Sequence, residues 1–196
     1  MLDLFAQEGV RAVFFILGER LQTPGAIDIV RRAASEGHLI GNHSMTHRRL
    51  TELPPDQIEA EILRTRELIA DFEPKQKLFR PPYGAWNNSV ISVAKRLGYK
   101  TVLWNVDSQD WKAENQPTRW VDIAIEGVQQ SRRSVCLFHD YNHTADHLPE
   151  MVRRMKQIPG CQFVGYDEPR DLVTYLGDVT RVSFHRTKRL LKLAPN

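Results

Sequence analysis

The sequence predicts an α/β fold of parallel strand–helix units, because short apolar runs alternate with longer amphipathic stretches along its 196 residues. No internal repeat and no low-complexity linker interrupts this alternation, which indicates a single domain. Helices placed between strands suit either an open doubly wound sheet or a closed barrel. Hydrophobic periodicity alone does not choose between these two architectures.

Six apolar runs are expected to form strands. The longest run extends from Ala12 to Leu17, which is the length of a buried strand. The predicted strands cover residues 11–17, 38–40, 78–79, 101–104, 134–138 and 162–164.

Six amphipathic stretches between these runs are expected to form helices. Gly37 and Gly98 each follow such a stretch, as C-terminal caps do. Proline at positions 24 and 55 marks two helix starts. The predicted helices cover residues 25–36, 55–72, 88–97, 119–130, 148–157 and 169–176.

The composition is that of a globular protein, with 41% apolar and 26% charged residues. A formal net charge of +3 is too small to indicate a nucleic-acid partner. No apolar run approaches the roughly 18–20 residues that span a bilayer. Cys136 lies in an apolar run and is expected to be a buried thiol, so the two cysteines indicate no disulfide framework.

The two ends of the chain lead to separate expectations. Residues 1–5 carry no basic segment of a signal peptide, so the chain as it stands is expected in the cytoplasm. The periplasm or the exterior is the alternative if a segment precedes it. We place the domain at 1–177 and a basic C-terminal tail at 178–196, which is either a solvated helix or a contact for an anionic polymer or membrane surface. The sequence indicates no oligomeric state.

Four polar clusters each follow a predicted strand, at residues 42–44, 80–84, 107–111 and 139–141. Functional residues of parallel β/α folds gather at the carboxyl ends of the strands. Because these clusters would lie on one rim, they predict a single site.

His43 and His47 are four residues apart, a spacing that puts two imidazoles on one face of a helical turn and suits two ligands to one metal ion. A third protein ligand is then needed. The alternative is a pair of surface or capping histidines.

His139 follows a buried run and suits general acid or base catalysis, with Asp110 as a carboxylate that orients its ring. A satisfied core histidine is the alternative. His139, His143 and His147 also repeat every four residues and would form a second metal-binding stripe on a continuous helix. We expect instead a loop at 140–142 and a helix start near residue 148.

Three more residues, in or next to these clusters, are candidates. Arg80 precedes two prolines that stiffen its loop, and it is expected to pair with a carboxylate in a bidentate manner. Trp111 and Leu137 would line an apolar pocket, or belong to the core.

Together these motifs resemble the polysaccharide deacetylases of carbohydrate esterase family four, the NodB-homology domain. The matching segments occur in family order over nearly the whole chain. They are residues 12–18 (AVFFILG), 36–47 (EGHLIGNHSMTH), 79–84 (FRPPYG), 107–111 (DSQDW) and 137–140 (LFHD).

The resemblance implies a distorted (β/α) barrel of the seven-strand deacetylase type and a divalent metal ion, most often zinc. His43 and His47 look like its metal ligands, and Tyr83 looks like the residue whose backbone N–H holds the oxyanion. The resemblance further implies that His139 is the general acid and Asp110 its tuning partner. Trp111 and Leu137 then look like the walls around the acetyl methyl group.

One departure from the family concerns its first motif, Thr-Phe-Asp-Asp, whose aspartates supply the catalytic base and the third metal ligand. This chain begins inside the helix that follows that motif, so the first strand of the barrel is missing and Arg80 lacks its partner. Asp3 lacks the strand context and is not assigned. A fragment or an internal start is the favoured explanation, and a non-catalytic relative or a substitute carboxylate are the others.

The predicted function is therefore a metal-dependent hydrolase that removes N-acetyl groups from an acetylated amino-sugar polymer or oligomer. A catalytically inactive sugar-binding relative and an O-acetyl esterase are the alternatives. The expected partner is an N-acetylated glycan, and the sequence does not specify which glycan.

Overall fold

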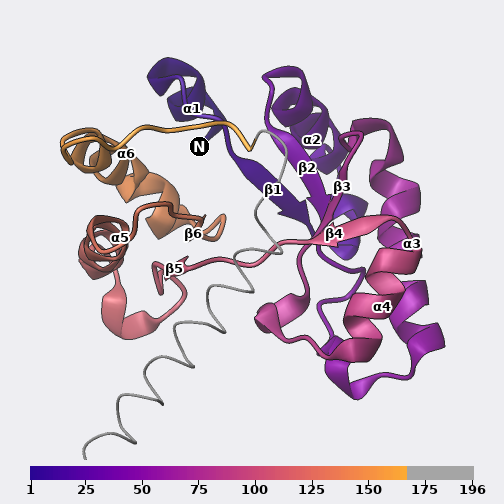
Figure 1. The fold of residues 1–196 in the computed structure, drawn as a ribbon. Coiled ribbons are helices and arrows are strands. Elements are labelled where there is room, and N and C mark those ends of the chain that lie inside the picture. Colours follow the sequence, from indigo (N-terminus) through magenta and orange to yellow (C-terminus); the bar gives the residue numbers. More distant parts are fainter. Residues whose placement is uncertain (167–196) are drawn as a thin grey trace, which may run out of the picture. The chain divides into compact units, whose positions relative to one another are not determined.

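The computed structural model describes residues 1–166 as an α/β unit with two parallel sheets (Figure 1). The first sheet has four strands in the order β1-β2-β3-β4, and the second pairs β5 with β6. The strands are β1 (Val13–Ile16), β2 (Leu39–Asn42), β3 (Lys77–Phe79), β4 (Tyr99–Thr101), β5 (Val106–Asp107) and β6 (Cys136–Leu137).

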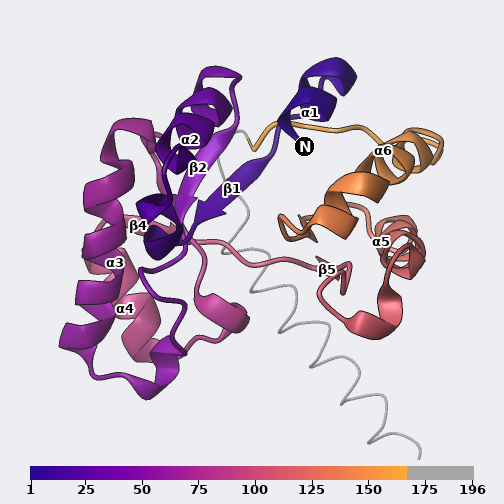
Figure 2. The ribbon, with the colours of Figure 1, turned by 180° about the vertical axis from the view of Figure 1, so that it is seen from behind.

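Helices connect these strands, as parallel pairing requires. Both views show α2, α3 and α4 on the same side of the four-stranded sheet, with α5 and α6 side by side near the second sheet (Figures 1 and 2). The helices are α1 (Leu2–Glu8), α2 (Ala26–Ser35), α3 (Pro55–Ile69), α4 (Asn88–Arg96), α5 (Arg119–Gln129) and α6 (Asn142–Lys156). Short 3-10 turns are η1 (Gly18–Gln22), η2 (Leu50–Glu52), η3 (Ala70–Phe72), η4 (Pro82–Gly84) and η5 (Ala113–Asn115).

The apolar core follows the two sheets. One cluster joins α3 and α4 to β3 and β4 and includes the fully buried Ile58 and Phe79. A second joins α2 to β2, and a third joins α5 to α6 around the fully buried Trp120. Burial of these side chains is the main favourable term in holding the helices against the strands.

The register of the strands brings the polar clusters together. Ile16 lies opposite Asn42, and Asn42 lies opposite Phe79, so the loops that follow β2 and β3 leave the sheet side by side. In the second sheet Asp107 lies opposite Leu137, so the loops after β5 and β6 are also neighbours. The expectation that the clusters follow strand ends is therefore confirmed for these four loops.

Most predicted elements are present, and the differences have local causes. The strand predicted at 101–104 is β4 at Tyr99–Thr101, because the carbonyls of Val102 and Leu103 accept hydrogen bonds from the Arg80 side chain. The two-residue strand β5 was not predicted, and the prediction of a strand at 162–164 was wrong.

The last helix of the described region begins earlier than expected. The loop predicted at 140–142 is present at residues 140 and 141, but the helix start near 148 was wrong, because α6 begins at Asn142 and includes Pro149. The Thr144 hydroxyl donates a hydrogen bond to Asp110, which ties the first turn of this helix to the loop after β5.

Some expectations lie outside the described residues. These are the helix at 169–176, the domain boundary at 177 and the basic tail at 178–196. Within residues 1–166, six strands form two parallel sheets, which are compatible with the predicted distorted barrel, and β1 is at the edge of the larger sheet. Among those residues no helix is both long and apolar enough to cross a membrane.

Candidate active site

His43 and His47 lie on the loop between β2 and η2. The helical turn expected for their spacing was wrong, because residues 43–49 form an irregular loop. Ser44 and His47 adopt left-handed backbone conformations, with φ of 66° and 56°. The two imidazole rings nevertheless pack edge to face, with centroids 5.0 Å apart.

The ring of His43 is fixed through one nitrogen. Its Nδ1 lies 2.7 Å from the backbone carbonyl oxygen of Arg80, and a carbonyl can only accept, so Nδ1 carries the proton. Burial lowers the pKa of His43 to about 4; the hydrogen bond to the Arg80 carbonyl opposes this change, and the charges of His47, Arg80 and His139 add to it. A neutral ring with Nε2 unprotonated is the form that binds a metal ion.

His47 has a less buried ring whose pKa is also lowered, first by burial and then by the charge of His139, while Glu19 opposes the change. Its ring contacts the Tyr83 ring at a centroid distance of 4.7 Å. His139 is close enough to His43 and His47 for its charge to act on the pKa of both.

Arg80 directly follows β3, and its side chain is buried. Its guanidinium lies 4.1 Å from the Phe15 ring centroid and 5.4 Å from that of Trp104. Nε and Nη2 donate to the carbonyls of Val102 and Leu103, both at 3.3 Å. Burial lowers the pKa of Arg80 to about 10. The expected bidentate carboxylate partner is not found within residues 1–166.

Tyr83 lies in the turn η4 with a left-handed φ of 60°, and its side chain is more than half exposed. The Arg49 guanidinium lies over its ring at 4.7 Å. Next to it, Gly84 also has a positive φ, and a Cβ there would approach the Trp104 ring to 2.7 Å. This close approach explains why glycine follows Tyr83.

Asp110 is completely buried and accepts four hydrogen bonds. The donors are His139 Nδ1 at 2.7 Å, His139 N at 2.8 Å, Thr144 Oγ1 at 2.8 Å and Ser108 Oγ at 3.2 Å. Burial by itself would raise the pKa of Asp110, but the bonds from His139 and Thr144 outweigh it, and the pKa lies below its usual value.

His139 therefore has a defined tautomer. Its Nδ1 faces a carboxylate and donates, which leaves Nε2 for proton transfer. The ring stacks on Tyr141 with centroids 5.2 Å apart, and Tyr141 stacks in turn on His143 at 5.3 Å. About a third of the His139 side chain is exposed, which leaves it accessible to a substrate.

The rival histidine stripe is not a second metal site in this structure. His143 and His147 lie on α6, whereas His139 lies in the loop before it. His143 Nε2 is 2.8 Å from the backbone carbonyl oxygen of Asp110 and so donates its proton there. His143 thus belongs to the support of Asp110.

Trp111 and Leu137 are placed at the same rim. Half of the Trp111 side chain is exposed, and Lys112 Nζ lies 5.3 Å from its ring centroid. Leu137 is partly buried in β6, opposite Asp107. Their role as walls of an acetyl pocket stays a prediction.

Two neutral imidazoles fit a divalent ion as part of its ligand set. Within the described part of the chain, no group of three or more His, Cys, Asp or Glu side chains is placed to hold a metal ion. The donor set found here thus amounts to His43 and His47.

Two residues that support the loop, Asn42 and Glu61, were not among the predicted site residues. Asn42 Oδ1 accepts from the N–H of Ser44 at 2.9 Å, and the Glu61 carboxylate accepts from Met45 and Thr46. Asn42 stood in a recognised cluster, but Glu61 is one of many charges on α3 and carried no signal.

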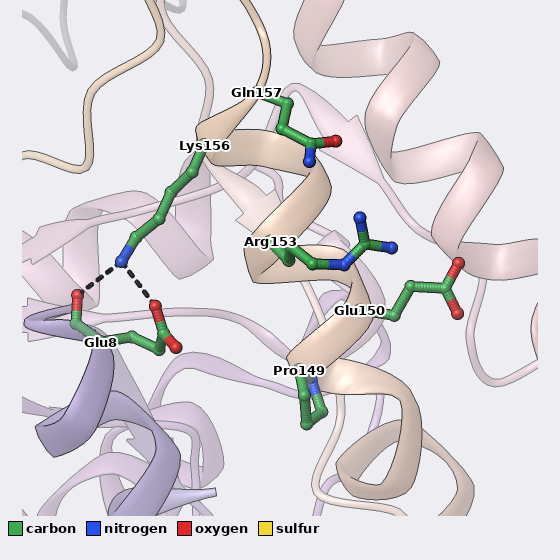
Figure 3. Close-up of a pocket in the computed structure, with 6 residues that line it drawn as sticks. All are labelled: Glu8, Pro149, Glu150, Arg153, Lys156 and Gln157. Atoms are coloured by element: carbon green, nitrogen blue, oxygen red, sulfur yellow. Dashed lines mark hydrogen bonds and ion pairs between the residues drawn. The ribbon is translucent and has the colours of Figure 1, made fainter.

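A surface hollow beside α6 is distinct from this site. Figure 3 shows Lys156 donating to the backbone oxygen and the carboxylate of Glu8, at 3.0 and 2.5 Å. The hollow contains none of the candidate residues. It is lined by Glu8, Pro149, Glu150, Arg153, Lys156 and Gln157.

The fold and site define an α/β protein with histidines and a buried aspartate at the ends of parallel strands. A family model described as polysaccharide deacetylase matches residues 1–102, just over half of the chain. The chain therefore belongs to the polysaccharide deacetylase family, and the resemblance seen in its motifs is confirmed.

Three similar proteins illustrate the relationship. The chitooligosaccharide deacetylase of Rhizobium leguminosarum bv. trifolii is 38% identical over 145 residues, which cover 71% of this chain and 63% of that protein. A family 4 carbohydrate esterase from Streptomyces lividans, solved in complex with acetate, matches with a TM-score of 0.70 and 30% identity over 85% of this chain and 89% of that one.

The third is a mutant of a CE4 family pseudoenzyme with restored enzymatic activity. It matches with a TM-score of 0.67 and 25% identity over 80% of this chain and 56% of that one. This chain spans less than two thirds of the length of the Rhizobium relative.

Proposed function

We propose that this chain is a metal-dependent hydrolase that removes N-acetyl groups from an acetylated amino-sugar polymer or oligomer. The observation that carries the proposal is the convergence of His43 and His47 with the Asp110–His139 pair at the ends of parallel strands. Family membership and the named deacetylase relative support the same activity.

The residues divide the work of amide hydrolysis. His43 and His47 would hold zinc through nitrogens that burial keeps unprotonated. A divalent ion at this position supplies an acidified water molecule and polarises the acetyl carbonyl. The backbone N–H of Tyr83 is assigned to the carbonyl oxygen, where negative charge develops.

His139 completes the reaction as the general acid. A carboxylate base, which is not assigned within residues 1–166, would take a proton from the attacking water as its oxygen bonds to the carbonyl carbon. The carbon–nitrogen bond then breaks, and a doubly protonated His139 gives the proton on Nε2 to the departing amine. Asp110 holds the opposite nitrogen and stabilises the protonated ring. Trp111 and Leu137 are assigned to the walls around the acetyl methyl.

The test is acetate release from N-acetylglucosamine oligomers by the 196-residue chain with added zinc, beside His43→Ala and His139→Ala. Release that both substitutions abolish supports the proposal and implies that a carboxylate of this chain acts as the base. Release that persists in His43→Ala would contradict the metal-site assignment.

A second candidate is a sugar-binding protein without turnover. Arg80 donates to backbone carbonyls and has no carboxylate partner within residues 1–166, and one structural relative is a CE4 family pseudoenzyme. Calorimetric binding of the same oligomers with no acetate released would favour this reading.

A further inference from the structure

We propose that Glu61 is a positioning residue for the loop that carries His43 and His47. Its buried carboxylate holds the backbone of Met45 and Thr46, and thereby sets the two imidazoles in place to bind a metal ion. The metal part of this inference rests on the proposed function, whereas the effect on the loop is measurable without metal.

The carboxylate of Glu61 accepts hydrogen bonds from the loop that carries His43 and His47. It projects from α3, and only 6% of the residue is exposed. Oε2 accepts the backbone N–H groups of Met45 at 3.1 Å and Thr46 at 2.9 Å. Oε1 accepts the Thr46 hydroxyl at 2.8 Å. Three donors from two adjacent loop residues thus converge on one side chain.

The loop needs such a support because its backbone is strained. Ser44 and His47, on either side of the pair held by Glu61, both adopt left-handed conformations that residues other than glycine rarely take. A strained conformation persists only where its surroundings fix it. The bonds to Glu61 lie between the two strained residues and fix both ends.

The carbonyl side of the same segment is held from η1. Gly18 N donates to the Ser44 carbonyl at 3.0 Å, and Glu19 N donates to the Met45 carbonyl at 2.9 Å. These bonds fix the carbonyl groups of the segment, and Glu61 fixes its N–H groups. Loss of the carboxylate would leave the Met45 and Thr46 N–H groups without a protein acceptor.

The same helix offers a matched control. Glu59 lies two positions earlier on α3, and its carboxylate pairs at 2.8 Å with Arg96, whose side chain is about half exposed. Glu59→Ala and Glu61→Ala are thus the same chemical change on the same helix, but only the second removes an acceptor from the loop.

The experiment compares wild type, Glu61→Ala and Glu59→Ala of the full chain by two measurements. The first is hydrogen exchange at the Met45 and Thr46 amides in metal-free protein. The second is zinc affinity, by competition with a chromophoric chelator. In Glu61→Ala, which removes the acceptor itself, we expect exchange at least tenfold faster and zinc affinity about tenfold to 100-fold weaker, and in Glu59→Ala both unchanged.

A merely structural role would give another pattern. If Glu61→Ala lowered the melting temperature but left both measurements within twofold of wild type, the proposal would be overturned. If that variant does not fold, Thr46→Val serves instead, because it removes one donor and keeps the carboxylate, and a several-fold change in zinc affinity is then expected. A wild-type chain that binds no zinc would contradict the proposed metal site, while amide exchange would still decide whether Glu61 holds the loop.

Discussion

The loop with His43 and His47 and the pair of Asp110 with His139 are held in place by different means. In the loop, the backbone is fixed by Asn42 and Glu61. In the pair, the side chains themselves are fixed, since four hydrogen bonds converge on the Asp110 carboxylate.

This difference matches what each region is proposed to do. A metal ligand must keep a nitrogen lone pair uncommitted, so the protein can hold the ring by only one nitrogen and must secure the rest through the main chain. A general acid instead benefits from a carboxylate bonded directly to its ring. Substitutions and pH changes that act on one of these regions and spare the other would test this contrast.

Asp110→Ala should have the largest effect on stability. It leaves the donors of His139, Thr144 and Ser108 without their acceptor, so we expect a loss of about 4 kcal/mol in the free energy of unfolding. Urea denaturation measures it. A loss below about 1 kcal/mol would mean that this region is not held through its carboxylate.

The stability contributed by the His43 loop should change with pH in a higher range than the stability contributed by Asp110. The pKa of His43 is about 4 in the fold against 6.5 in the unfolded chain, so the unfolded state binds the proton first as pH falls. In metal-free protein we expect stability to be full above pH 6.5 and to fall by about 3 kcal/mol by pH 4. His43→Gln should flatten this decline, and an unchanged decline would assign it to another group.

Asp110 should act only at lower pH. Because its pKa in the fold is lowered from 3.8, its contribution is present above that value and is lost as pH falls further. Asp110→Asn should therefore weaken the pH dependence below 3.8 and leave the His43 range intact. If the two variants changed stability in the same pH range, the His43 loop and the Asp110 pair would not be held by separate groups.

Gly18→Ala should have a moderate effect that concentrates on the loop. A Cβ at this position would lie 2.5 Å from both Met45 Sδ and Thr65 Oγ1. We expect a loss of about 2 kcal/mol, together with weaker zinc binding because Gly18 also bonds the Ser44 carbonyl. Thermal unfolding and metal competition, run on the same samples, check both parts.

Asn87→Ala should have the smallest effect and leave the site intact. Asn87 caps α4 by accepting the Val90 N–H at 3.0 Å, and it does not touch the loop. A loss of about 1 kcal/mol with unchanged zinc affinity is expected. A parallel loss of affinity would show that general stability, rather than the local support, controls metal binding.

The secondary structure that follows from local hydrophobic patterns was predicted well from the sequence. Apolar runs and amphipathic stretches located most strands and helices, and the strand ends located the clusters that contain His43, Arg80, Asp110 and His139. The 2.7 Å contact between Asp110 and His139 agrees with the orienting role predicted for the aspartate. That role itself remains a prediction.

The sequence did not predict what depends on distant contacts. Glu61 resembles any other helix charge until the fold brings it to residues 45 and 46. The early start of α6 was missed because Thr144 is bonded to Asp110, which lies more than thirty positions away. Arg80 was expected to pair with a carboxylate, but its guanidinium donates hydrogen bonds to the backbone carbonyls of Val102 and Leu103, just after β4.

The left-handed residues beyond the strand ends have a consequence for protein engineering. Ser44, His47, Tyr83 and Gln109 all have φ between 56° and 66°, where glycine would relieve steric strain. A programme of thermostabilisation would select glycine at such positions. Glycine would also widen the range of conformations open to each loop. A glycine variant at one of these positions should therefore gain thermal stability and lose catalytic activity together.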